Sequence, residues 1–222
     1  VALLEPGRHV GGMVSGGLGK TDHGRKAVIG GMSREFFERV GKHYNEPITW
    51  YFEPHVAEKV FKDWLQEANV KVIFNQRVDS VTRSDPLGRV NGKPAGPRIT
   101  SIRMKSRTEF SARVFIDSSY EGDLMARSGI SYTVGRDGAD QYGESLAGVR
   151  AHSQYHQFKA KVSPCDDQGN LLPGVYGGER GEPGQGDHKV QAYNFRICLS
   201  NQPDNQVPFP KPADYDPARY EL

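Results

Sequence analysis

The chain has 222 residues, a formal net charge of +2 at pH 7, 36% hydrophobic residues and 25% charged residues. This composition predicts a soluble globular protein of one large domain, or of one domain and part of another, without the bulk charge that binds nucleic acid. No apolar stretch approaches the roughly 20 residues needed to cross a bilayer. The two cysteines, Cys165 and Cys198, lack metal-binding or redox spacing, so we expect free thiols.

The first predicted element is a short strand that ends in a carboxylate. Apolar residues 1–4 precede Glu5, and a buried parallel strand with an acid at its carboxyl end is typical of doubly wound α/β folds, where the acid can bind ribose hydroxyls. The segment GGMVSGGLGKTD, residues 11–22, is too rich in glycine to favour helix or strand. Its bare N–H groups allow a large anionic ligand to approach closely. An ordinary turn at Pro6 and Gly7 explains the strand end equally well.

Two helices and a strand are predicted next. Residues 33–43 predict a short helix that begins at Ser33 as N-cap and buries one apolar face. Residues 53–67 predict a longer helix, because Pro54 suits its first turn and apolar residues recur at helical spacing. Residues 70–74 predict a strand, and such a helix–strand step is typical of an α/β sheet.

The next predicted element is an antiparallel meander at about residues 76–110. Residues 78–82 and 99–104 alternate between polar and apolar side chains, and the loop between them is rich in turn residues. Residues 114–117 then predict a third buried strand, again ending in a carboxylate. The turn that follows leads into a helix, for which Asp123 is the expected cap.

The second half of the chain is richer in proline and glycine. Residues 190–199 alternate between polar and apolar side chains and predict a strand of an antiparallel sheet. Residues 174–187 predict a long glycine-rich loop, either mobile or folded over a site.

Several segments resemble, in order, the bacterial FAD-dependent oxidoreductase family, whose flavoprotein fold is of the glutathione-reductase type. They are GGMVSGGLGKTD at 11–22, ARVFIDSSYEGDLMA at 112–126, YTVGR at 132–136 and QAYNFR at 191–196. The resemblance implies an α/β fold with two parts. Residues 1–135 would form an incomplete Rossmann-like FAD-binding domain that contains the β-meander, and residues 136–222 would form part of a β-rich substrate domain.

The resemblance implies FAD as the cofactor and gives several residues a place beside it. Glu5 would hold the adenosine ribose, with Arg8 near that ribose or the diphosphate, and the backbone of Val78 would contact adenine. An ordinary strand valine explains Val78 equally well. Asp117 would bind a hydroxyl group of the ribityl or diphosphate region. The glycine-rich segment would line the diphosphate first and then the isoalloxazine, through Gly11, Gly12, Met13, Ser15, Gly16, Gly17 and Leu18.

The reaction that this resemblance implies is hydride removal from a small polar or sugar-like substrate to flavin N5, assisted by a base. The candidate catalytic residues are Asp22, His23, Tyr120 and Glu121. Further candidate bases are His152, His156 and His188. No metal site is predicted, because His152 and His156 have neither an HExxH motif nor a third ligand nearby.

Two other interpretations stay open at this point. A glycan-processing or glycan-binding protein would use the C-terminal half, rich in Tyr, Asn and Gln, and keep the α/β unit as a scaffold. Alternatively, the chain is an inactive piece, because no strand–GxGxxG–helix unit precedes its first strand. We therefore expect a fragment that binds FAD weakly, if at all, with a small-molecule substrate and no nucleic-acid or membrane-spanning partner.

Overall fold

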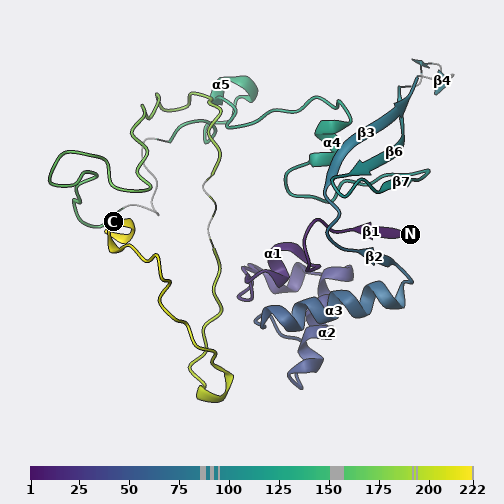
Figure 1. The fold of residues 1–222 in the computed structure, drawn as a ribbon, viewed down its shortest axis with the longest axis horizontal. Helices are drawn as coiled ribbons and strands as arrows, with labels where there is room; N and C mark the ends of the chain where they lie inside the picture. The colour runs from purple at the N-terminus through teal and green to yellow at the C-terminus, as the bar shows by residue number, and fades with distance from the viewer. Residues whose placement is uncertain are drawn as a thin grey trace. The chain divides into compact units, whose positions relative to one another are not determined.

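The structure is a computed structural model that describes residues 1–85, 89–90, 93–94, 96–150, 158–191, 193 and 195–221 (Figure 1). Its internal contacts divide the chain into two units. The first unit comprises Val1–Tyr132 and Asn194–Ser200, and the second comprises Thr133–Tyr193 and Asn201–Leu222. The predicted division of labour between a cofactor domain and a substrate domain stays a prediction.

A short parallel sheet opens the first unit. β1 (Ala2–Leu4) pairs in parallel with β2 (Lys71–Ile73), and the Glu5 N–H continues the pairing by donating to the Ile73 carbonyl at 2.9 Å. Both strands were predicted from the sequence, the first of them as a parallel strand, and the structure adds that they pair with each other. The expectation that β1 is fully buried is wrong, because Leu3 and Leu4 are only half-buried.

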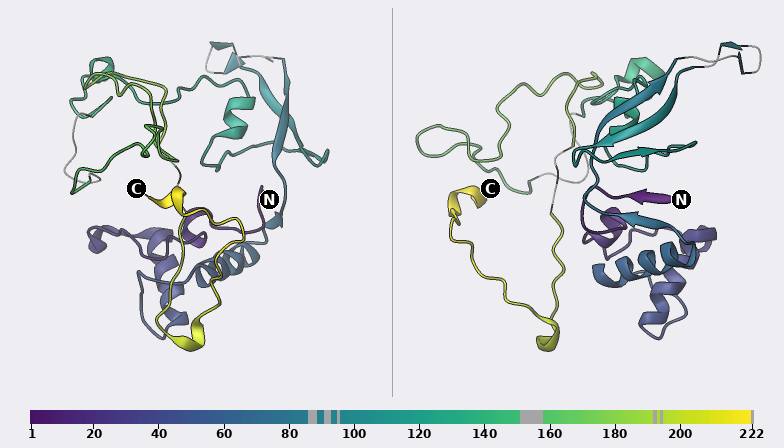
Figure 2. Two further views of the ribbon diagram at one scale, coloured as in Figure 1. Left: turned by 60° about the vertical axis from the view of Figure 1, so that its left-hand side comes forward. Right: turned by 45° about the vertical axis from the view of Figure 1, so that its right-hand side comes forward.

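Two helices form the core beside this sheet. α3 (Pro54–Glu67) begins at the predicted proline, whereas α2 (Gly31–His43) begins two residues before the predicted cap, with Gly30 in that place. α3 contacts α2 and β2, and both helices lie on the same side of the β1–β2 pair in every view (Figure 2). The apolar faces of the helices and the loop between them make the core, which consists of Phe36, Phe37, Val40, Trp50, Phe52, Val56, Ala57 and Val60.

The glycine-rich segment forms one helical turn, α1 (Gly12–Ser15), and is followed by a 3-10 turn, η1 (Lys26–Val28). The expectation that this segment forms no regular structure is therefore wrong over four residues. α1 packs on α3 so closely that a Cβ atom at Gly11 would lie 2.5 Å from Cδ2 of Phe61. Gly11 also has a φ of +104°, so both its space and its backbone require glycine.

The antiparallel meander forms as predicted. β3 (Val78–Ser84), β6 (Arg98–Met104) and β7 (Glu109–Ser111) pair in that order, and β4 (Arg89–Val90) pairs with β5 (Lys93–Pro94) as a hairpin. The helix predicted after the meander is α4 (Asp123–Arg127), which packs on β3.

Two predicted strands are absent, and each prediction is corrected here. Residues 114–117 form no strand, and Val114 and Ile116 are 72% and 80% exposed. The described residues of 190–199 also form no strand. An apolar sequence pattern shows only that the side chains can be buried. A strand also needs the edge of a neighbouring strand, to which its backbone N–H and C=O groups can form hydrogen bonds. In the part of the chain that the structure describes, neither segment has such an edge.

The second unit is mostly irregular. It contains α5 (Ala139–Tyr142), η2 (Pro203–Asn205) and η3 (Pro217–Tyr220). Among its described residues the antiparallel pairing is limited to the isolated bridges Arg136–Asp187 and Cys165–Leu171. Residues 174–187 form a loop, as predicted.

Both cysteines are free, as expected from their spacing. His152 and His156 lie outside the described residues. No helix among the described ranges is long and apolar enough to span a membrane.

The ends of the bridge between Arg136 and Asp187 are tied by their side chains as well as by their backbones. Arg136 Nε donates to Asp187 Oδ1 at 3.0 Å, and Arg136 Nη2 donates to Oδ2. The Arg136 guanidinium is the main cause that lowers the pKa of Asp187 to about 2. The pair therefore stabilises the fold above the ordinary carboxyl pKa of 3.8, and this contribution is lost as the pH falls towards 2.

We expect Asp187 to titrate with a midpoint near pH 2 and the variant Arg136→Gln to move that midpoint up towards 3.8. The measurement is an NMR titration of the side-chain carboxyl carbons between pH 1.5 and 6. A midpoint that is the same in both proteins would show that the guanidinium does not hold the carboxylate in solution.

Candidate functional site

The predicted cofactor site begins where β1 ends. The Glu5 side chain is half-buried, and its Oε1 atom accepts a hydrogen bond from the Gly7 N–H at 2.7 Å. Oε2 accepts no hydrogen bond from any described residue. The carboxylate is therefore held in place by one oxygen atom and can bind hydroxyl groups through the other.

The backbone amides that follow are also open. The N–H groups of Gly11 and Gly12 donate to no acceptor within the described ranges, and both residues have positive φ, +104° and +56°. A strand-end acid followed by exposed amides suits a ligand that carries a ribose and then phosphates, because the first needs acceptors and the second needs donors. The residues present therefore fit the adenosine diphosphate half of FAD.

Tyr120 joins this segment from 107 residues further along the chain. Its Oη atom accepts a hydrogen bond from the Met13 N–H at 2.8 Å. A Cβ atom at Gly12 would lie 2.3 Å from the same Oη, so the phenol rests directly on the glycine backbone. The structure thus brings a predicted catalytic residue against predicted cofactor-binding residues, although the catalytic role itself stays a prediction.

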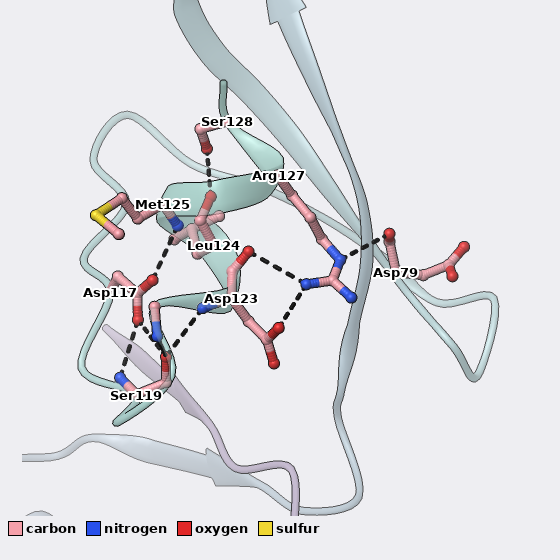
Figure 3. Close-up of polar contacts among 9 residues, drawn as sticks. Asp79, Asp117, Ser119, Asp123, Leu124, Met125, Arg127 and Ser128 are labelled. Atoms are coloured by element: carbon pink, nitrogen blue, oxygen red, sulfur yellow. Dashed lines mark hydrogen bonds and ion pairs between the residues drawn. The ribbon is translucent and has the colours of Figure 1, made fainter. Parts of the chain in front are cut away.

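The loop that carries Tyr120 is ordered by Asp117 (Figure 3). Asp117 Oδ1 accepts the Ser119 N–H at 2.9 Å and the Ser119 hydroxyl at 2.7 Å, and Oδ2 accepts the Met125 N–H at 2.9 Å. Ser119 Oγ in turn accepts the N–H groups of Gly122 and Asp123 at 3.0 and 3.3 Å. Asp117 and Ser119 therefore cap α4, and the expectation that Asp123 caps it is wrong because Asp123 is the first helical residue.

These hydrogen bonds keep Asp117 ionised. Burial disfavours its charged form, but the donors from Ser119, Met125 and Leu124 outweigh burial and lower the pKa of Asp117 below its ordinary value. Both oxygen atoms of the carboxylate accept hydrogen bonds from its own loop and from the start of α4. Its predicted contact with a hydroxyl group of FAD stays a prediction.

Two arginines fasten this loop to the meander. Arg127 Nη1 donates to Asp123 Oδ1 at 2.6 Å, and Arg127 Nε donates to the carbonyl oxygen of Asp79 at 3.0 Å (Figure 3). Arg83 Nη1 donates to the carbonyl oxygen of Ser128 at 2.6 Å. The α4 loop is thereby fixed along β3, whose first residue is Val78.

Sequence reasoning did not identify either arginine. The spacing of Asp123 and Arg127, four residues apart on a short helix, was the one available indication of their ion pair.

The remaining predicted cofactor-binding residues, 15–18, form the end of α1 and the turn after it. Ser15 Oγ donates to the Val10 carbonyl at 2.5 Å, and the N–H groups of Gly16 and Leu18 donate to the Met13 carbonyl at 3.2 and 3.1 Å. A Cβ atom at Gly17 would lie 2.6 Å from the Cβ of Arg196, so the chain near residue 196 passes close to this turn.

The loop before the glycine segment is tied to α3. His9 Nδ1 lies 3.1 Å from Glu58 Oε2, and Lys62 Nζ lies 2.8 Å from Glu58 Oε1. The hydrogen bond from Lys62 is the main cause that lowers the pKa of Glu58. The side chain of the neighbouring Arg8 is exposed and makes no hydrogen bond or ion pair with any described residue.

His23 is the catalytic candidate with the most contacts. Its ring meets the ring of Trp50 edge-on at 5.4 Å between centroids and lies 6.3 Å from the ring of Tyr51. His23 Nδ1 lies 3.0 Å from the Gly24 carbonyl oxygen. Asp22 and Glu121 are exposed, and their side chains make no hydrogen bond or ion pair within the part of the chain that the structure describes.

Comparison with known proteins gives one match. The profile of the family described as FAD dependent oxidoreductase matches residues 1–222. No curated protein and no solved structure matches the chain.

Proposed function

The chain belongs to the FAD dependent oxidoreductase family, and from this premise we propose that it oxidises a small polar or sugar-like substrate by hydride removal. The family membership makes it an enzyme with FAD as its cofactor and favours this function over a glycan-binding scaffold. FAD supplies the electron acceptor when bound, and the protein supplies binding, orientation and proton transfer.

The observation that carries the assignment of the cofactor site is the open polar edge after β1. Glu5 Oε2 and the amides of Gly11 and Gly12 are unpaired among the described residues, and they follow one another along the chain. We assign the ribose to Glu5, with Arg8 nearby, and the diphosphate to residues 11–13. Ser15, Gly16, Gly17 and Leu18 are assigned to the isoalloxazine side, Val78 to the adenine and Asp117 to a hydroxyl group of the cofactor.

His23 is the proposed base. A carbonyl oxygen only accepts hydrogen bonds, so the contact with Gly24 requires the hydrogen on Nδ1 and leaves the Nε2 lone pair of the neutral ring available. The edge of Trp50 restrains the ring in this orientation. Asp22, Tyr120 and Glu121 are the alternative groups for proton transfer.

The variant Glu5→Gln tests the ribose assignment. Exchanging an ionised acceptor for a neutral amide is expected to weaken FAD binding roughly five- to tenfold, the equivalent of about 1 kcal/mol. FMN has no adenosine ribose, so its affinity should stay unchanged. The measurement is a titration of flavin fluorescence with the wild-type chain and the variant.

The matched control is Glu46→Gln, which removes an exposed carboxylate far from β1 in the sequence and should alter neither affinity. Equal weakening of FAD and FMN by Glu5→Gln would place Glu5 elsewhere in the site. Unchanged FAD affinity would remove Glu5 from it.

A further inference from the structure

A surface of cations and aromatic rings begins at Lys20, near the end of the glycine-rich segment. It consists of Lys20, His23, Lys26, Trp50 and Tyr51, and we call it the basic–aromatic cluster. Lys20 Nζ lies 5.9 Å from the centroid of the Tyr51 ring, and Lys26 Nζ lies 5.5 Å from that of Trp50. The His23 ring lies near both aromatic rings.

Backbone pairing holds the cluster together. The Phe52 N–H donates to the Gly19 carbonyl at 2.9 Å, and the Thr21 N–H donates to the Trp50 carbonyl at 3.2 Å. The two chain segments approach so closely that a Cβ atom at Gly19 would lie 2.1 Å from the Phe52 carbonyl oxygen. The cations are therefore carried on a fixed frame that continues from the proposed flavin segment.

The charge of this frame is not neutralised. Lys20, Arg25 and Lys26 form no ion pair within the described ranges, and Asp22 is the single carboxylate among residues 20–26, which leaves a net charge of +2 with His23 neutral. By contrast, Lys59 and Lys62 on α3 each pair with a carboxylate.

The two rings differ in exposure. Trp50 is 8% exposed and belongs to the core, whereas Tyr51 is 51% exposed. The cluster thus combines a rigid apolar base, an accessible aromatic ring and cations beside both rings.

We propose that the basic–aromatic cluster binds the substrate and selects a small organic acid with a polyol body, such as a sugar acid. The cations attract its carboxylate, because charge-assisted hydrogen bonds are stronger than neutral ones. Tyr51 receives the C–H face of the carbon chain, since aromatic rings pack well against apolar faces. This assignment rests on the proposed function, because it places the acid beside His23 and the flavin segment.

The test uses Trp50 as a local reporter. The chain contains two tryptophans, so Trp64→Phe on α3 leaves Trp50 as the single indole. The probes are galacturonate and its methyl ester, which differ only in the charge of the carboxyl group, at pH 7 and constant ionic strength. We expect galacturonate to produce a saturable change in Trp50 emission and the ester to bind at least about tenfold more weakly.

Variants of the two lysines separate charge from structure. Replacing Lys20 and Lys26 together by glutamine should weaken galacturonate binding at least about tenfold, whereas replacing both by arginine should preserve it. Lys105→Gln, on the turn between β6 and β7, is the control and should bind like the parent. A far-UV spectrum confirms that each variant is folded.

Equal binding of galacturonate and its ester, or unchanged binding in the glutamine variant, would overturn the assignment of an acidic substrate. Flavin titration of the same proteins tells this failure from a failure of the proposed function. If the chain binds FAD but does not prefer galacturonate to its ester, only the proposed substrate class is refuted. If the wild-type chain does not bind FAD, the proposed cofactor site is refuted.

Discussion

The variant Gly12→Ala is expected to weaken FAD binding at least about tenfold. Its Cβ atom would lie 2.3 Å from Tyr120 Oη, so the exposed phenol must turn away from the glycine backbone and lose its hydrogen bond from the Met13 N–H. Gly12 also has a φ of +56°, where a side chain costs about 1 kcal/mol. Both effects disturb the amides assigned to the diphosphate. The measurement is a titration of flavin fluorescence.

Two further variants isolate the cause. Gly31 has nearly the same φ, +57°, but a Cβ atom there would meet no other atom within 4 Å, so Gly31→Ala carries the strain without the clash and should bind FAD normally. Adding Tyr120→Ala to Gly12→Ala removes the clash and should recover part of the affinity. A Gly12→Ala chain that binds FAD like the wild type would contradict the placement of the diphosphate at this segment.

Among the variants proposed for this protein, Gly41→Ala should lower the free energy of unfolding the most. Gly41 is buried in the last turns of α2, and its Cβ atom would lie 2.7 Å from the Glu46 carbonyl oxygen and 2.8 Å from the Ile48 Cα. Both contacts are with backbone, which cannot rotate away. Overpacking of this kind typically costs about 1–3 kcal/mol, and we expect the upper part of that range.

Urea unfolding followed by tryptophan fluorescence measures this effect, because Trp50 lies in the same core. Gly96→Ala is the matched control. No atom lies within 4 Å of its Cβ position, so its free energy of unfolding should stay within about 0.5 kcal/mol of the wild type. Equal unfolding midpoints for all three proteins would show that the loop after α2 does not pack against Gly41 in solution.

The helices of the core could be predicted because their information is local. Pro54 marks the first turn of α3, and the apolar spacing of residues 53–67 identifies its buried face. The same holds for the parallel strands β1 and β2 and for the meander, whose alternation is confirmed by the pairing of β3, β6 and β7.

The errors arose where structure depends on distant partners. The apolar residues 114–117 have the pattern of a strand, but pattern alone supplies no neighbouring edge. The carboxylate that accepts an N–H group of the first turn of α4 belongs to Asp117, six residues before the helix. The prediction chose Asp123 because it lies next to the helix in the sequence, and this was wrong. The contact between Tyr120 and the Met13 amide spans 107 residues and has no local sequence pattern.

The parts of the proposed site could be singled out from the sequence, whereas the contacts between them could not. Glu5 and the glycine-rich segment stand out because their residue types suit a ribose and a diphosphate, whereas the packing of Tyr120 onto Gly12 and the anchoring of the α4 loop by Arg127 required the structure.

The most direct test of the account is a calorimetric titration of the wild-type chain with FAD and, separately, with FMN. The account predicts weak but saturable binding at one site per chain, with FAD bound more tightly than FMN because Glu5 and the amides of Gly11 and Gly12 hold the adenosine diphosphate half. Equal affinities for the two flavins, or no saturable binding of FAD at millimolar concentration, would contradict it.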